Sequence, residues 1–200
     1  MRRLVLASSN TGKLAELRPL LADTGLELVA QSELGVQDAI EDGLSFVENA
    51  LIKARHACRM TGLPALADDS GVVVDALGGA PGLISAHYAG MHGDGAGNIA
   101  RVLHELEGVP DARRSARFHC TLVLLRHAGD PQPLIAEGSW EGRILHAPRG
   151  EGGFGYDPIF FDPVLQAGAG ELPPELKNRV SHRGRALAVL REKLAGLALA

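Results

Sequence analysis

The fold is decided first by residues 4–21, which read LVLASSNTGKLAELRPLL. The opening run, Leu4-Val5-Leu6-Ala7, is short and apolar, as is typical of a strand inside a sheet. Leucines then recur at the spacing of one helix face, at Leu14, Leu17, Leu20 and Leu21. We expect this helix to stop near Asp23-Thr24-Gly25, where glycine suits a C-terminal cap, and a strand to follow over Leu26–Ala30. The strand–helix–strand opening predicts an α/β protein.

The rest of the chain continues to alternate strand and helix patterns. Ser45-Phe46-Val47-Glu48 is a capping box, and it predicts a helix through Met60. Asp68-Asp69-Ser70-Gly71 is typical of a tight turn between two strands, and Gly129-Asp130-Pro131 of a hairpin turn. Further strands are expected at residues 63–67, 72–74, 118–125, 134–145 and 158–161, and further helices at 98–107 and 181–197. Since no internal repeat or clean linker interrupts the pattern, residues 1–200 are predicted to form a single domain.

Composition and charge narrow the class of protein. Hydrophobic residues make up 46% and charged residues 22% of the chain, which is ordinary for a globular protein and excludes disorder. The formal net charge of −4 gives no general attraction to nucleic acid or to an anionic membrane, so neither is an expected partner. Cys58 and Cys120 form no ligand-like pair, which favours buried thiols in a reducing compartment. With too short an apolar run after Met1-Arg2-Arg3 for a signal peptide and no stretch able to cross a bilayer, we expect a cytoplasmic protein.

The first candidate binding segment follows the first strand and consists of Ser8, Ser9, Asn10, Thr11, Gly12 and Lys13. Unpaired backbone N–H groups and the positive end of the helix dipole attract phosphate at such a helix start. Lys13 adds a full positive charge, and Gly12 allows close approach of the backbone. The spacing GxxxxGK of a Walker A loop is absent. A capped helix start with a surface lysine is the alternative reading of the same residues.

The second candidate is a carboxylate group formed by Asp68 and Asp69, with Glu41 as a third acid. Adjacent carboxylates repel one another, so they invite a cation or protonation. Magnesium prefers hard oxygen ligands and open positions beside substrate phosphates. Because strand side chains alternate, one aspartate is expected to bind metal and the other to serve a separate role. The alternatives are a solvated hairpin turn for the aspartates and a helix-dipole partner for Glu41.

Two further groups supply aromatic and basic side chains. Phe154, Gly155, Tyr156 and Asp157 belong to a glycine-rich run, where an exposed ring suits stacking on a nucleobase. Lys177, His182 and Arg183 lie at the predicted start of the last helix, where cations oppose the dipole unless an anion or acceptor is near. The alternatives are two rings that fill the core beside Phe160 and Phe161, and a solvated basic helix start. Together the four groups predict a nucleotide site.

At this point the chain resembles the inosine/xanthosine triphosphate pyrophosphatases, a family of dITP/XTP diphosphatases. The matching motifs occur in consistent order over nearly the whole chain, at residues 6–13, 43–50, 67–71, 77–82, 153–160, 177 and 181–183. One departure is Ser8-Ser9, which stands where many members carry Thr-Gly. The hydroxyl at Ser8 is kept, so the difference concerns the backbone freedom at Ser9.

The resemblance implies an elongated, mixed and twisted α/β sheet flanked by helices, with two lobes around a deep substrate cleft, and a homodimer. It implies that residues 8–13 grip the triphosphate of a purine nucleotide such as dITP, ITP or XTP. It also implies that Asp69 is the proton acceptor and a Mg²⁺ ligand, with Glu41 on the same metal. Substrate contacts are carried over to Ser70, to residues 154–157 and to Lys177, His182 and Arg183.

These roles agree with a simple chemical hypothesis. Asp69 takes a proton from a water aligned with the α-phosphorus, while Lys13 and Lys53 neutralise charge on the departing pyrophosphate. Donors from Ser181-His182-Arg183 pair with the oxygen at purine position 6 and mismatch the amino group of adenine. The rival functions are a nucleotide sensor without hydrolysis and a magnesium-dependent phosphatase of another small phosphate ester. A structural or nucleic-acid-binding role fits the charge least well.

Overall fold

The computed structural model describes residues 2–21 and 25–195, apart from the side chains of Arg2, Thr11 and Leu20. Two predicted boundaries, the turn at Asp23-Thr24 and the helix end at Leu197, therefore lie outside the described residues. The described strands are β1 (Arg2–Leu6), β2 (Leu26–Ala30), β3 (Ala65–Val74), β4 (Ser115–Leu125), β5 (Leu134–Ile144), β6 (Phe160–Asp162) and β7 (Ala167–Gly168).

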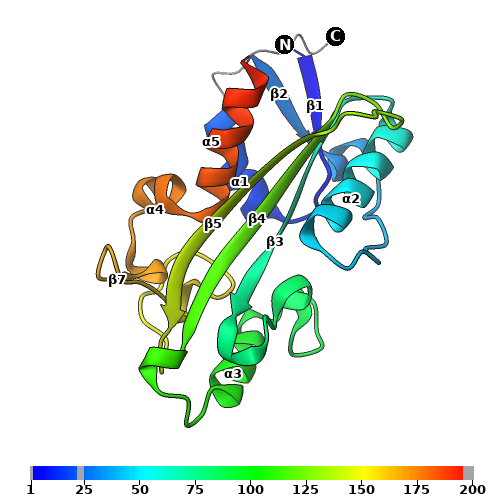
Figure 1. Cartoon of the computed structure of the whole chain (residues 1–200). Coiled ribbons are helices and arrows are strands. Elements are labelled where there is room, and N and C mark those ends of the chain that lie inside the picture. Colours follow the sequence, from blue (N-terminus) through cyan, green and yellow to red (C-terminus); the bar gives the residue numbers. More distant parts are fainter. Residues whose placement is uncertain (1, 22–24, 196–200) are drawn as a thin grey trace. The chain divides into compact units, whose positions relative to one another are not determined.

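These strands form one sheet in the order β2-β1-β3-β4-β5-β6-β7 (Figure 1). β1 lies parallel to both β2 and β3, with Val5 opposite Val29 on one side and Ala65 on the other. β6 pairs antiparallel with β5 and with β7. The predicted α/β class with a mixed sheet is confirmed, whereas the predicted cleft between two lobes stays a prediction.

Five α-helices are described: α1 (Thr11–Leu21), α2 (Phe46–Thr61), α3 (Gly95–Glu105), α4 (Pro174–Val180) and α5 (His182–Leu194). The predicted cap of α2 at Ser45 is confirmed, because its hydroxyl accepts a hydrogen bond from Glu48 N, while the Glu48 carboxylate accepts from the Ser45 hydroxyl and from Leu44 N. The helix predicted at 98–107 begins earlier, since the Asp94 carboxylate caps it by accepting from Gly97 N. None of the helices in the described ranges is both long and apolar enough to span a membrane.

The predicted turn at Asp68–Gly71 is wrong. These residues continue β3, which runs unbroken from Ala65 to Val74. The Asp-Asp-Ser-Gly pattern favours a turn because carboxylates usually need water. Here lysines from two helices pair with the aspartates, so the strand can carry them while buried.

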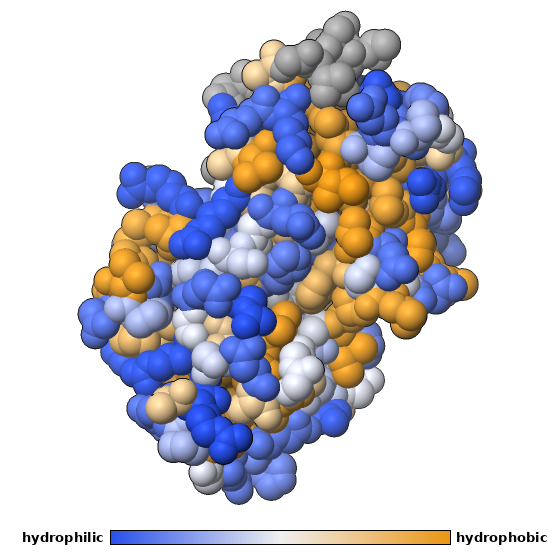
Figure 2. Space-filling model, viewed as in Figure 1, coloured by the Kyte–Doolittle hydropathy of each residue, from blue (hydrophilic) through white to orange (hydrophobic). Residues whose placement is uncertain are grey.

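The chain divides into two compact units, and their boundaries fall inside β3, β4, β5 and α5. Unit 1 comprises residues 1–69, 120–138 and 184–200, and unit 2 comprises residues 70–119 and 139–183. The single-domain assignment of residues 1–200 stays a prediction. On the face drawn in Figure 2, hydrophilic residues are interspersed with hydrophobic areas.

Unit 1 has a hydrophobic core on each face of its strands, because successive strand residues point to opposite faces. One core joins Leu4, Leu6 and Leu66 to apolar residues of α1 and α5. The other joins Val5, Ala65 and Ala67 to the alanine face of α2. The alternation continues along β3, so Asp68 faces α1 and Asp69 faces α2. The apolar run read from the sequence thus positions both acids.

Unit 2 has its own core, built around Trp140, Phe160 and Phe118 with residues of α3. The Trp140 indole donates a 2.7 Å hydrogen bond to Asp162, so its polar edge is satisfied inside the core. Cys58 and Cys120, both in unit 1, are buried free thiols as predicted.

Candidate functional site

The segment after β1 forms a helix start whose backbone is fixed by its own side chains. The Ser8 hydroxyl accepts from Asn10 N at 3.1 Å, and the Asn10 side-chain oxygen accepts from Lys13 N at 3.1 Å. No acidic residue lies in the first turn of α1, so the positive helix end keeps its attraction for an anion. Gly12 lies in that same turn. The Thr11 side chain is among those that the structure does not describe. The predicted phosphate segment is therefore a capped N-terminus of an 11-residue helix.

Ser9 differs from its neighbours because its hydroxyl contacts another segment. It donates a 2.6 Å hydrogen bond to Asp38, whose other oxygen accepts from the Gln31 side chain. Asp38 belongs to the irregular segment 36–44, which also holds Glu41. The Ser9–Asp38 bond thus joins the helix start to the segment that carries a predicted metal ligand.

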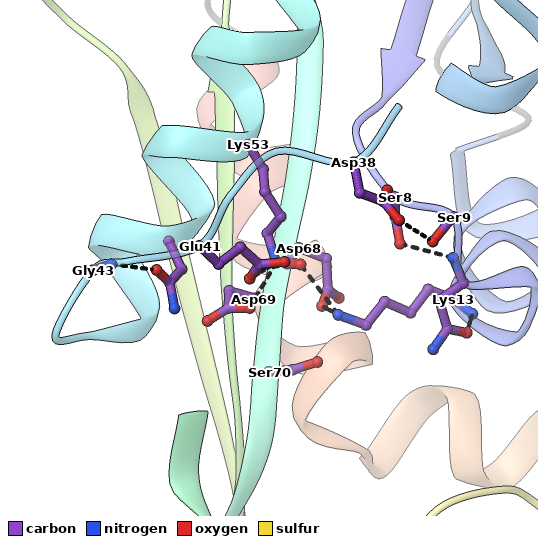
Figure 3. A network of polar contacts seen from close by, with 12 residues as sticks. Ser8, Ser9, Lys13, Asp38, Glu41, Gly43, Lys53, Asp68, Asp69 and Ser70 are labelled. Atoms are coloured by element: carbon purple, nitrogen blue, oxygen red, sulfur yellow. Dashed lines mark hydrogen bonds and ion pairs between the residues drawn. The ribbon is translucent and has the colours of Figure 1, made fainter. Parts of the chain in front are cut away.

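Lys13 and Lys53 each hold a different carboxylate of β3 (Figure 3). The Lys13 ammonium lies 2.5 Å from Asp68 Oδ1, on the α1 side of the strand. The Lys53 ammonium, from α2, lies 2.6 Å from Asp69 Oδ1 and 2.9 Å from Glu41 Oε2. All five of these residues belong to unit 1, so the predicted phosphate and metal groups are brought together.

The segment that carries Glu41 is fastened to α2 at two further points. His56 Nε2 lies 3.0 Å from Gln37 O, and Gly43 N donates to the buried Asn49 side chain at 2.9 Å. A β-carbon at Gly43 would lie 2.7 Å from Asn49 Oδ1, so glycine is required for this close approach. Glu41 is therefore held beside Lys53 by packing as well as by charge.

The electrostatic environment of Asp69 suits a group that gains and loses a proton. Burial raises the pKa of Asp69 to about 6, since the charges of Lys53 and Lys13 lower it only in part and Glu41 raises it further. Burial would lower the pKa of Lys53, but the charges of Asp69 and Glu41 outweigh that effect and raise it. The lysine thus stays an ammonium while the aspartate can titrate near neutral pH.

The acid pair also fits a magnesium ion by its chemistry. Asp69 Oδ2 is buried and accepts no hydrogen bond within the described part of the chain, which leaves an oxygen available as a ligand. Glu41 is half-exposed and offers a second carboxylate. One or two carboxylates beside substrate phosphates are the usual protein contribution to a magnesium site. No group of three or more His, Cys, Asp or Glu able to hold a metal is found among residues 2–21 and 25–195.

The aromatic group lies in unit 2, where the two rings have different surroundings. Phe154 is 41% exposed, and the Lys177 ammonium lies 4.8 Å from its ring centroid. Tyr156 is buried in the unit 2 core and donates a 2.8 Å hydrogen bond to Ser85 O. Of the two alternatives left open by the sequence, the stacking platform fits Phe154 and the core position fits Tyr156.

Asp157 and Lys177 do not lie on an open surface. One oxygen of the buried Asp157 carboxylate accepts from Phe154 N at 2.7 Å and from Lys177 Nζ at 2.8 Å. Lys177 lies in α4, so its predicted place at the start of the last helix is wrong. This short helix was not predicted from the sequence. Pro173 is its N-cap and Pro174 is its first residue.

His182 and Arg183 begin α5 and are buried rather than solvated. Arg183 donates a 3.1 Å hydrogen bond to the Ser70 hydroxyl, and its guanidinium lies 5.9 Å from the Phe154 centroid. The His182 ring stacks on Phe118 at 4.9 Å between centroids. Ser181, predicted as the first residue of this helix, instead caps the end of α4. Within unit 2, contacts thus join Ser70, Phe154, Lys177 and Arg183, while His182 is next to Arg183 in the chain and packs on Phe118.

Two positioning residues were not predicted from the sequence, and a third residue that was predicted has additional contacts. Asp38 and Ser85 carry no motif, and their contacts with Ser9 and Tyr156 join residues far apart in sequence. Asp157 was expected to contact substrate, yet its carboxylate is engaged by its own loop and by Lys177.

A mixed sheet that carries two lysine–carboxylate pairs, beside a helix N-terminus without an acidic residue in its first turn, defines the chain as an α/β protein with a charged candidate site. Residues 4–193 match the family model described as Ham1 family. The chain therefore belongs to the Ham1 family.

Relatives and solved structures are similar to this chain over nearly its full length. A dITP/XTP pyrophosphatase of Xylella fastidiosa (strain 9a5c) is 64% identical over 97% of this chain and 98% of its own. The dITP/XTP pyrophosphatase of Pectobacterium atrosepticum is 57% identical over 97% of this chain and 98% of its own. The structure of a HAM1 protein from Coxiella burnetii has a TM-score of 0.92 and 51% identity, covering 98% of this chain and all of that one. A nucleoside-triphosphatase / dITP/XTP pyrophosphatase from Mycobacterium abscessus has a TM-score of 0.77 and 46% identity over 94% and 98% of the two chains.

Proposed function

We propose that this protein is a nucleoside-triphosphate pyrophosphatase that converts non-standard purine nucleotides such as dITP, ITP and XTP to the monophosphate and pyrophosphate. The observation that carries the proposal is the grouping of Lys13, Lys53, Asp69 and Glu41 beside the N-terminus of α1. Full-length relatives named dITP/XTP pyrophosphatase support it. Such hydrolysis removes unwanted purines from the nucleotide pool.

Asp69 is the general base in this proposal. It takes a proton from water, the water oxygen bonds to the α-phosphorus, and the bond from that phosphorus to the bridging oxygen of the β-phosphate breaks. Its oxygen Oδ2 accepts no hydrogen bond in the described ranges and has lone pairs for a proton as well as for a cation, while Oδ1 is fixed by Lys53. A positioned general base contributes about 100- to 10,000-fold to rate.

The polyphosphate is held by the helix start and its lysine. The ammonium of Lys13 meets the phosphate oxygens, together with backbone N–H groups of residues 8–13 other than those of Ser8, Asn10 and Lys13, which donate within the chain. We infer that Glu41 and Asp69 hold Mg²⁺, which when bound neutralises phosphate charge and stabilises the pyrophosphate leaving group. Lys53 orients both acids, because its ammonium bonds to each of them.

Unit 2 supplies the contacts to the base. Phe154 offers an exposed ring for stacking, and the donors of His182 and Arg183 suit the oxygen at purine position 6. Adenine has an amino group at that position, so it meets these donors without an acceptor. A buried mismatch of this kind costs about 1–3 kcal/mol.

One panel assay tests the activity against its two rivals. Purified protein is incubated with dITP, ITP, XTP, ATP and GTP, with and without Mg²⁺, and pyrophosphate, orthophosphate and bound nucleotide are measured separately. Pyrophosphate from the first three nucleotides, dependent on Mg²⁺, is the expected result. Orthophosphate alone would indicate a phosphatase of another phosphate ester, and binding without either product would indicate a nucleotide sensor.

We also propose, from the resemblance to the family, that the protein works as a homodimer in the cytoplasm, with both compact units serving a single pyrophosphatase domain. Light scattering at working concentration gives the molar mass, and twice 21.0 kDa is the expected value. Cell fractionation tests the location.

A further inference from the structure

We propose that Asp68 is a positioning residue that aims the ammonium of Lys13 at the polyphosphate. The proposal rests on the proposed function, because it takes Lys13 to meet the phosphates. That function leaves Asp68 without a role, since the base and the metal ligand are assigned to its neighbour Asp69.

A single residue fixes the place of the Lys13 ammonium. Lys13 Nζ lies 2.5 Å from Asp68 Oδ1 and donates a 3.1 Å hydrogen bond to the backbone oxygen of Asp68. The two acceptors belong to β3, in the middle of a sheet, and Asp68 is fully buried. The end of a long side chain is thereby tied to a strand that has a neighbouring strand on each side.

The carboxylate itself is held from its other side. Cys120 Sγ, on β4, lies 3.4 Å from Asp68 Oδ2 and donates to it. Cys120 is fully buried in the core that also contains Leu4 and Leu66. Asp68 therefore cannot turn to follow Lys13, and the lysine must adopt the geometry that the strand sets.

The number of N–H donors on the Lys13 ammonium determines which way its remaining donor points. An ammonium has three N–H donors, and two of them are used by Asp68. Lys13 has no other acceptor within residues 2–21 and 25–195. Its side chain is 14% exposed, so part of it is open to an incoming ligand. Fixing two donors determines where the third points, which a lysine free to change rotamers would not achieve.

Electrostatic attraction for phosphate does not by itself explain why Lys13 is paired with Asp68. Asp68 cancels much of the Lys13 charge and so weakens a purely electrostatic attraction for phosphate. Stability does not explain it either, because apolar replacement of a buried ion pair is often neutral or stabilising. If Asp68 serves to orient the Lys13 ammonium, the reduced net charge and the small effect of the pair on stability are both accounted for.

A double-mutant cycle tests the proposal with Asp68→Asn, Lys13→Met and the combined variant, measuring pyrophosphate release from ITP. If Asp68 acts through Lys13, Asp68→Asn lowers kcat by about tenfold or more while KM changes less than about threefold. In the Lys13→Met background the same substitution changes kcat by less than about twofold, because the group to be aimed is gone. Equal factors in both backgrounds would overturn the proposal, as would full activity of Asp68→Asn.

Two further variants separate positioning from folding. Asp130→Asn is the matched control, because Asp130 is also a buried acid of unit 1. It pairs with Arg126 in the turn after β4, and no catalytic or binding role is proposed for it. The kcat of Asp130→Asn is expected to equal that of the wild type. Lys13→Arg keeps the charge at a partly exposed helix start but changes the donor geometry, so kcat should fall by about tenfold. An unchanged kcat in Lys13→Arg would refute positioning even if Asp68→Asn did not fold. Absence of pyrophosphate release by the wild type would instead refute the proposed function.

Discussion

The ammonium of Lys53 lies 2.6 Å from Asp69 Oδ1, and the same ammonium bonds to Glu41 at 2.9 Å. One lysine thus holds the two acids expected to bind a metal. Asp69 keeps its second oxygen, Oδ2, buried and without a hydrogen-bond partner in the described ranges. A carboxylate fixed at one oxygen and open at the other is suited to accept a proton from a substrate water.

The role of Asp69 as base predicts the effect of Asp69→Asn. The amide keeps the shape of the side chain but cannot take up the proton, so kcat should fall by about 100- to 10,000-fold. Nucleotide binding, measured by calorimetry with ITP, should remain detectable because Lys13 and the helix start are unchanged. A variant with wild-type turnover would exclude Asp69 as the base.

The same substitution predicts a pH-dependent change in stability. The pKa of Asp69 is raised to about 6 in the folded chain, above its unfolded value of about 3.9, because of burial. Its contribution to stability is therefore fully present below pH 3.9 and is lost as the pH rises through about 6. In EDTA-treated protein, Asp69→Asn should gain about 3 kcal/mol of unfolding free energy over the wild type at pH 8, and nothing at pH 4. Urea unfolding at the two pH values measures this difference, and an equal gain at both would contradict it.

The sequence predicted those parts of the site that depend on local patterns. The strand, polar turn and helix at residues 4–21 were predicted because apolar spacing and capping act over a few residues. The Asp68–Gly71 strand was missed because it depends on Lys13 and Lys53, which come from other elements. Likewise, composition cannot say which ring of the glycine-rich loop is buried. That choice depends on Asp157, whose carboxylate fixes Phe154 N and would collide with any side chain at Gly153.

Arg183 is predicted to select the base. It lies buried, with the Ser70 hydroxyl and the Phe154 ring as neighbours, and its fork of donors suits the carbonyl oxygen at purine position 6. Arg183→Ala should reduce the ratio of kcat/KM for ITP over ATP by about tenfold. Arg179→Ala, which removes an exposed arginine of α4, is the control and should leave the ratio unchanged. The same ratio in wild type and Arg183→Ala would remove this residue from base recognition.

Phe154 is predicted to contribute by stacking. Its ring is 41% exposed although two cations lie near it, so it presents a flat apolar face to solvent. Phe154→Ala should raise KM for ITP by about 5- to 100-fold with little change in stability, since stacking on a base is worth about 1–3 kcal/mol. Phe154→Tyr keeps a ring and should retain a KM close to that of the wild type. Equal KM values for Phe154→Ala and Phe154→Tyr would count against stacking.

Tyr156 should behave in the opposite way from Phe154, although both lie in the same loop. Its ring packs in the unit 2 core, and its hydroxyl donates to Ser85 O, which also accepts from the Asn98 side chain. Tyr156→Phe keeps the ring and removes one buried hydrogen bond, so unfolding free energy should fall by about 1 kcal/mol.

Because the Ser85 oxygen retains Asn98 as a donor, the loss should not grow to the full cost of an unsatisfied carbonyl. KM and kcat for ITP should stay within about twofold of the wild type, since the hydroxyl points into the core rather than toward a ligand. Chemical denaturation and steady-state kinetics on the same preparation measure both effects. A large rise in KM with unchanged stability would instead make Tyr156 a direct contact of the substrate, as the family resemblance implied, and would require the loop to rearrange when nucleotide binds.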